Sequence, residues 1–194
     1  MVAAAPFYPF GLDIEPPAPQ SRLGIFFRPI LVIPHIIVVG ILSLVVEILV
    51  VLAWFIIVIT GKLPGGFASF VLNVYHWAVR MQAYIYLLTG KYPPFAMGPD
   101  AAYPVRFWGE AKLDGRSRLT VFFRLFMVIP HAIVLYILQI VASVLLFIGW
   151  VAGIFIGRLP GFIHDFVSGY LRWNTRVGAY LYLLTDEYPP FSMN

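Results

Sequence analysis

The residues of this chain that could do chemistry are few, and they stand inside or beside long apolar stretches. Glu47 is the one acidic residue in the first long apolar run, residues 36–61. A carboxylate inside a membrane span is costly, so such residues usually pair with a base or serve a function. If the next segment returns across the membrane, Arg80 lies at a similar depth, which predicts an intramembrane ion pair between Glu47 and Arg80. Arg176 is the alternative partner and an ion path the alternative role, although Ser143 replaces the acid in the second half of the chain.

Arginine and tryptophan residues recur at the same positions of the two halves. In each half an arginine follows a tryptophan by three residues, and another arginine interrupts a short apolar stretch near the start. A guanidinium beside an apolar surface can reach lipid phosphates, or a partner's carboxylate, while its stem stays among apolar groups. The predicted lipid- and partner-contact residues are Arg28, Arg80, Arg124, Arg176, Trp77 and Trp173.

Two histidines, His35 and His131, each follow a proline. If symmetry relates the two halves, the two imidazoles could ligate one haem iron axially. The favoured interpretation is a histidine at the start of a helix near the membrane interface, beside Arg28 or Arg124. We therefore expect no metal and no cofactor, with haem as the alternative.

Several classes of enzyme site find no support in the residues. The chain has no cysteine, which excludes disulfides, thiolate metal sites and a cysteine nucleophile. It also carries no P-loop, nucleophile-elbow, zinc-protease or dinucleotide-binding pattern. The sequence therefore indicates no catalytic chemistry.

The composition is that of a membrane protein. Hydrophobic residues make up 61% of the 194 residues and charged residues 11%, whereas a soluble domain carries about a quarter charged residues. Residues 132–157 form a run of 26 without Asp, Glu, Lys or Arg. As a helix this run is about 39 Å long, more than a hydrocarbon core of about 30 Å. The net charge of +4 is better explained by membrane orientation than by nucleic-acid binding, because the basic residues are not clustered.

An internal repeat organises most of the chain. A shift of 96 residues aligns residues 21–96 with 117–192 without a gap, and 35 of the 76 positions are identical. Two packed copies of one module, related by a pseudo-two-fold axis, are the expected result.

The repeated blocks are specific enough to show a resemblance. They include Phe27-Arg28, Pro34-His35, the Gly61-x-Leu63-Pro64 turn and a Tyr-Pro-Pro-Phe exit that begins at Tyr92. This pattern resembles an uncharacterised family of bacterial multipass membrane proteins, catalogued as a domain of unknown function. The resemblance covers about four-fifths of the chain and implies the bacterial cytoplasmic membrane, but it brings no activity.

The sequence of each module predicts three helices, so the predicted fold class is all-α. A short helix near the headgroups ends where Pro34 or Pro130 breaks it, and a long span follows, because an internal proline removes a backbone donor. The next helix, residues 67–89 or 163–185, carries a polar stripe and either spans the membrane or lies flat at its surface. The distribution of basic residues favours four spanning helices with both termini cytoplasmic. Two crossings per module would place the two copies in parallel.

Two further segments complete the predicted organisation. Residues 1–20 form a proline-rich mobile tail before module 1 at residues 21–96. Residues 97–116 form a linker whose Tyr103, Phe107 and Trp108 suit an interfacial aromatic belt. Module 2 occupies residues 117–194.

These features predict a non-catalytic accessory or structural subunit of a larger membrane assembly, with lipid contacts. Its expected partners are the lipid bilayer and other membrane subunits, with no nucleic acid and no soluble substrate. A small transporter, channel or lipid-handling protein is the alternative, and a haem-binding redox subunit is a weaker one.

Overall fold

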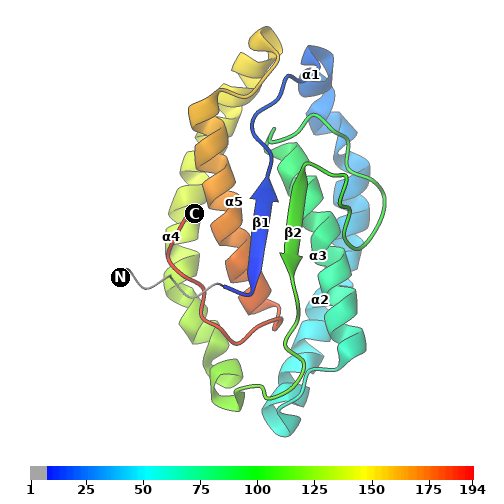
Figure 1. Cartoon of the computed structure of the whole chain (residues 1–194), viewed down its shortest axis with the longest axis vertical. Helices are drawn as coiled ribbons and strands as arrows, with labels where there is room; N and C mark the ends of the chain where they lie inside the picture. The colour runs from blue at the N-terminus through cyan, green and yellow to red at the C-terminus, as the bar shows by residue number, and fades with distance from the viewer. Residues whose placement is uncertain (1–7) are drawn as a thin grey trace.

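The computed structural model describes residues 8–194, so the first seven residues of the predicted tail, Pro6 among them, lie outside the described residues. The chain is mostly helical and alternates in direction along one long axis (Figure 1). Its elements in chain order are β1 (Phe10–Ile14), α1 (Arg22–Leu31), α2 (Ile33–Thr60), α3 (Gly65–Ile85), β2 (Val105–Gly109), α4 (Arg118–Ile156) and α5 (Gly161–Leu181).

The ends of the long helices follow from local sequence. Both α2 and α4 end at a glycine with φ +72°, Gly61 and Gly157, a left-handed conformation that costs glycine little. Pro64 and Pro160 then stand at the N-caps of α3 and α5. The repeated Gly-x-Leu-Pro turn therefore ends the long helix in both modules.

The two modules treat their internal proline differently. In module 1 the helix is interrupted at Val32, so the predicted short helix is separate from the long one. In module 2 the prediction of a break is wrong, because α4 runs through Pro130 for 39 residues. A tertiary contact accompanies the disturbed turn: the Tyr188 hydroxyl donates to the carbonyl of Met127, three residues before Pro130, at 3.0 Å. An uninterrupted helix is possible here because proline removes only one backbone donor.

The modules are antiparallel, not parallel as expected. The backbone N–H of Gln20 donates to the Gly157 carbonyl at 2.7 Å, and that of Arg116 to the Gly61 carbonyl at 3.1 Å. The start of each module thus lies at the end of the other module's long helix. The pseudo-two-fold axis therefore runs across the helices and inverts one copy relative to the other.

The tail and the linker each contribute a strand. β1 and β2 pair antiparallel, with Leu12 opposite Phe107, and the rings of Phe10 and Phe107 stack at 5.6 Å. Tyr103 and Phe107 are buried, so they do not form the predicted interfacial belt. β1 packs against α5, and Gln20 at the end of the predicted tail donates to the Leu87 carbonyl, whereas residues 15–19 are exposed. Each of the two segments has too few alternating apolar residues to predict a strand from the sequence.

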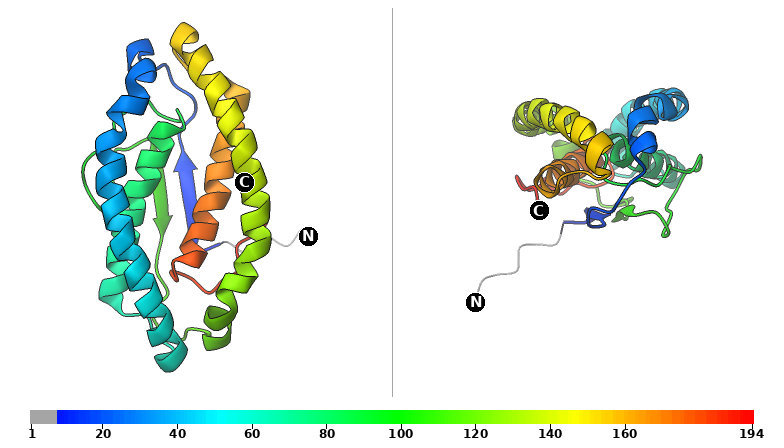
Figure 2. Two further views of the ribbon diagram at one scale, coloured as in Figure 1. Left: turned by 180° about the vertical axis from the view of Figure 1, so that it is seen from behind. Right: turned by 90° about the horizontal axis from the view of Figure 1, so that it is seen from above.

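The molecule has three layers (Figure 2). The first, which we call the apolar layer, consists of α1, α2 and α4; α3 and α5 form the second layer, and the strands the third. Two helices of the apolar layer, α2 and α4, are long and apolar enough to cross a membrane, whereas α3 and α5 do not meet that criterion. The large exposed apolar side chains outside the apolar layer are few: Tyr92, Phe95, Met97, Leu113, Phe162, Tyr188 and Phe191.

Candidate functional site

The repeated histidine of each module stands in an aromatic cluster. His35 is fully buried, and its Nδ1 accepts a hydrogen bond from Trp77 Nε1 at 3.0 Å. Its ring stacks on Phe95 at 4.0 Å and contacts Tyr92 at 4.9 Å. This cluster explains why the Pro-His and Tyr-Pro-Pro-Phe blocks occur together, since the second block folds back over the first.

Module 2 repeats the cluster around His131. Trp173 Nε1 donates to His131 Nδ1 at 3.1 Å, and Phe191 stacks on the imidazole at 3.8 Å. The two histidines make no ring contact with each other within residues 8–194, and each is enclosed by its own module. Trp77 and Trp173 are both buried, and each donates a hydrogen bond to the histidine of its own module.

Arg28 holds the end of α3. It is 4% exposed, and its Nη1 donates to the carbonyls of Tyr84 at 2.8 Å and Thr89 at 3.1 Å. Its guanidinium lies 4.2 Å from the centre of the Tyr84 ring, a cation–π contact. Its Nη2 donates to Gln20 Oε1 at 2.7 Å. Arg28, which was predicted to contact lipid, is therefore buried inside module 1 and binds backbone carbonyls at the end of α3.

Arg124 does the same in module 2 but with a carboxylate. Its Nη2 donates to Asp186 Oδ1 at 2.9 Å, and Arg116 Nε donates to the same oxygen at 2.9 Å. Burial raises the pKa of Asp186. Hydrogen bonds from Arg116 and the Ser117 N–H, together with the charges of Arg116 and Arg124, lower the pKa by more than burial raises it, so the net pKa is below its usual value. The cluster of Arg116, Arg124 and Asp186, which we call the ion triad, was missed from sequence.

Module 1 forms the equivalent junction around Arg28, but there the partners of the arginine carry no charge. Gln20 stands where Arg116 stands in module 2, and its Nε2 donates to the Leu87 carbonyl at 2.7 Å. Gly90 replaces Asp186, and a Cβ at Gly90 would lie 3.2 Å from Gln20 Cγ. The exchange of Gly90 for Asp186 in the repeat alignment was the available signal for the triad.

Arg80 and Arg176 hold the chain that follows each aromatic exit. Arg80 donates to the carbonyls of Ala96 at 2.5 Å and Gly98 at 2.6 Å. Arg176 donates to the carbonyls of Ser192 and Asn194, both at 2.5 Å. These contacts make the two arginines structural anchors of the module ends.

The predicted pair of Glu47 and Arg80 is not formed. Glu47 is exposed on α2, and no ion pair or hydrogen bond to it occurs in the described part of the chain. The partners of Arg80 are backbone carbonyls, which an argument from side-chain types and helix depth does not consider.

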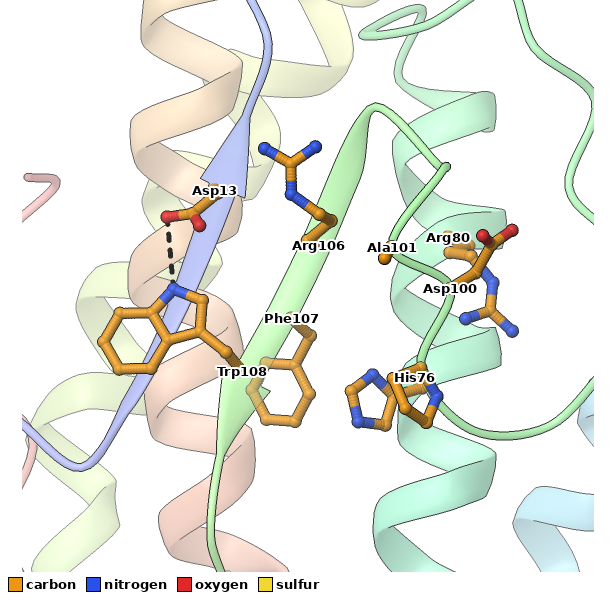
Figure 3. Close-up of a pocket in the computed structure, with 9 residues that line it drawn as sticks. Asp13, His76, Arg80, Asp100, Ala101, Arg106, Phe107 and Trp108 are labelled. Atoms are coloured by element: carbon orange, nitrogen blue, oxygen red, sulfur yellow. Dashed lines mark hydrogen bonds between the residues drawn. The ribbon is translucent and has the colours of Figure 1, made fainter.

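A pocket of about 450 Å³, lined by charged and aromatic residues, lies between α3 and the sheet (Figure 3). Asp13 of β1 accepts a hydrogen bond from Trp108 Nε1 of β2 at 3.1 Å at its rim. His76, Arg80 and Asp100 line its other side. Two acids and two arginines, the second being Arg106 on β2, therefore line the pocket with balanced charge.

His76 is neutral at physiological pH. Burial, and then the charge of Arg80, lower its pKa to about 4. A neutral imidazole can accept or donate a hydrogen bond, but no serine, threonine or cysteine lines this pocket. The pocket thus suits polar recognition better than nucleophilic catalysis. Residues 8–194 also hold no group of three metal-binding side chains.

Two apolar grooves open on the apolar layer where the modules meet. Their volumes are about 480 Å³ and 510 Å³. The tryptophan in the long helix of each module donates a hydrogen bond to the other module. Trp54 Nε1 donates to the Val121 carbonyl at 2.9 Å, and Trp150 Nε1 donates to the Ile25 carbonyl at 2.8 Å. The grooves are related by the repeat, as their lining pairs demonstrate: Arg28 and Arg124, Leu87 and Leu183, Trp150 and Trp54.

Comparison with protein families matches both modules. The model of a domain of unknown function, DUF4389, covers residues 22–97 and 118–193. The chain belongs to the DUF4389 family. The expected resemblance and the tandem repeat are thereby confirmed. A search of curated proteins and a search of solved structures each found no match. The family and the two long apolar helices of this DUF4389 protein fit a membrane protein.

Proposed function

We propose that this DUF4389 protein is a non-catalytic accessory subunit of an assembly in the bacterial cytoplasmic membrane. The observation that carries the proposal is the separation of its two faces. Large exposed apolar side chains gather on α1, α2 and α4, whereas charged side chains line the pocket beside the sheet. Lipid covers the first face, and another protein binds the second.

The sheet face suits a protein partner. The pocket offers Arg106 and Trp108, which belong to the residue types enriched at protein interfaces. It also offers two carboxylates, Asp13 and Asp100, to complementary charges of a partner. The two-stranded sheet of the described chain also leaves one edge of each strand without a neighbouring strand, so a partner strand could add to it.

Purification in mild detergent tests the accessory role. We expect a stoichiometric protein partner with the wild type and its loss from Arg106→Glu, which reverses a charge at the pocket. Arg118→Glu makes the same charge change at the exposed start of α4 and should keep the partner. A wild-type protein that purifies without any stoichiometric partner would contradict the proposal.

A small transporter or lipid-handling protein is the second candidate, and the inverted relation of the modules favours it. Inverted repeats are common in secondary transporters. The two grooves beside Trp54 and Trp150 could each hold an acyl chain. Purified protein alone in liposomes should then move a fluorescent lipid or an ion; its inactivity beside a stoichiometric partner would favour the accessory role.

A further inference from the structure

The arrangement of the layers points to a membrane orientation that differs from a simple crossing. We propose that the molecule lies flat in one leaflet, with its long axis parallel to the membrane. The apolar layer is immersed in hydrocarbon, α3 and α5 lie near the headgroups, and the sheet faces water. This inference rests on the proposed membrane location and adds the surface and the lipid that it contacts.

The first argument is the length of the exposed apolar surface. On α1 and α2 it extends from Leu23, 71% exposed, to Ile59, 70% exposed. These residues are about 54 Å apart along the helices, against a hydrocarbon core of about 30 Å. On α4 the same surface extends from Leu119 to Ile156, about 55 Å. Fitting it inside the core by tilt would need about 56°, beyond the usual range of up to about 40°.

The second argument is the position of the sheet. The strands lie midway along the long axis, beside the middle of the helices (Figure 1). A crossing along that axis would bring the sheet to the depth of the bilayer centre. The ion pair of Arg106 and Glu15, at 3.1 Å with side chains 38% and 54% exposed, would then lie in hydrocarbon. Charges and open sheet edges exposed to lipid are both strongly disfavoured.

A flat orientation removes both conflicts, whereas Glu47, exposed on α2, stays in the apolar layer in either orientation. One layer of helices is about 10 Å thick, which fits within one leaflet's hydrocarbon of about 15 Å. Charged side chains stand at both ends of the long helices and can reach up to the headgroups: Arg22, Lys62, Arg118 and Arg158. The pseudo-two-fold axis then coincides with the membrane normal, so both modules lie at the same depth.

The two grooves gain a common environment in this orientation. Both open on the apolar layer and face the acyl chains of the same leaflet. The buried Nε atoms of Arg28 and Arg124, which line them, make no hydrogen bond within the described chain. The apolar walls of the grooves contact the acyl chains of that leaflet in this orientation, whereas the two Nε atoms need an acceptor that an acyl chain does not offer.

Counting labels on single molecules tests the orientation. The chain has no cysteine, so Lys62→Cys and Arg158→Cys can be combined without background thiols. These exposed positions lie in the turns at opposite ends of the molecule. A membrane-impermeant maleimide is added to the protein in sealed phosphatidylglycerol–phosphatidylcholine vesicles, and intact mass counts the labels per chain. The flat orientation gives none or two, whichever way each molecule faces; a crossing gives one.

Two controls separate the possible failures. In detergent the double variant should take two labels, which measures completeness. Glu15→Cys, on the sheet, should be labelled in vesicles to the same extent as the turns, because a flat molecule exposes all three to one side. Single labels per chain in protein that floats with the vesicles would overturn the flat orientation alone. Protein that does not float at all would overturn the membrane location itself.

Discussion

At the scale of residues, the decisive feature is that the arginines repeated in both modules donate to the protein's own backbone carbonyls. Arg28, Arg80 and Arg176 each donate to carbonyls at the ends of segments, and Arg124 adds a carboxylate. Buried backbone carbonyls need partners, and a guanidinium has five donors in a fixed fork. These arginines therefore stabilise the module whether or not they also meet lipid.

The ion triad gives the sharpest prediction at this scale. Asp186→Asn removes the carboxylate between Arg116 and Arg124 and leaves two buried cations close together. We expect a loss of on the order of 3 kcal/mol in the free energy of unfolding in detergent. Asp165→Asn, at a side chain 82% exposed, is the matched control and should change little. Equal stability of the two variants would show that the triad is not needed.

The same carboxylate predicts a pH dependence. Because the folded state holds the pKa of Asp186 below 3.8, its stabilisation is complete above that value and is lost as pH falls through the lower folded pKa. The stability difference between wild type and Asp186→Asn should therefore be constant from pH 7 to about pH 5. It should shrink only at more acidic pH. Chemical unfolding in detergent at several pH values measures it, and a difference that grows towards acid would contradict the assignment.

At the scale of elements, proline and tyrosine act together across the module. Tyr188 donates to the Met127 carbonyl in the turn before Pro130, as Tyr92 does to the Leu31 carbonyl before Pro34. The exit segment thereby supplies a donor to a helix turn that the proline disturbs. Module 1 is interrupted at Val32 although it has the same bond, so the hydroxyl contact does not by itself decide whether the helix continues through the proline.

This coupling can be measured by a double-mutant cycle. Tyr188→Phe removes the hydroxyl donor, and we expect a loss of about 1 kcal/mol in unfolding free energy. Pro130→Ala returns a backbone donor to the neighbouring Phe126 carbonyl and removes the ring that disturbs this turn, so the same change should cost less in that background. Thermal unfolding of the four proteins gives the coupling energy. A cost of Tyr188→Phe that is the same in both backgrounds would show that the hydroxyl acts independently of the proline.

At the scale of the whole molecule, close packing between the modules fixes their relative position. The Tyr75 hydroxyl of α3 donates to the Thr175 carbonyl of α5 at 3.0 Å. A Cβ at Gly178 would lie 2.1 Å from that hydroxyl oxygen, so only glycine allows this approach of the two helices. At this contact between α3 and α5 the two modules are therefore closely packed.

A single methyl group tests this contact. Gly178→Ala should lower the unfolding free energy by about 1–3 kcal/mol, because Tyr75 must move or the helices must separate. Gly161→Ala adds the same group where no atom lies within 4 Å and is the matched control. Differential scanning fluorimetry in one detergent compares them. If both variants melt at the wild-type temperature, the close approach does not contribute to stability.

Much of this protein was determined by its sequence alone: the apolar class, two modules of equal length, the ends of the long helices at Gly61 and Gly157, and the family. These features depend on composition, on spacing along one chain and on local backbone preference, all of which sequence records directly. The tertiary structure alone decided the antiparallel modules, the strands in the tail and in the linker, and the partners of Arg80 and Asp186. Those features depend on which surfaces pack together and on which backbone carbonyls lie near a side chain in space. The order of residue types along the chain does not specify these contacts.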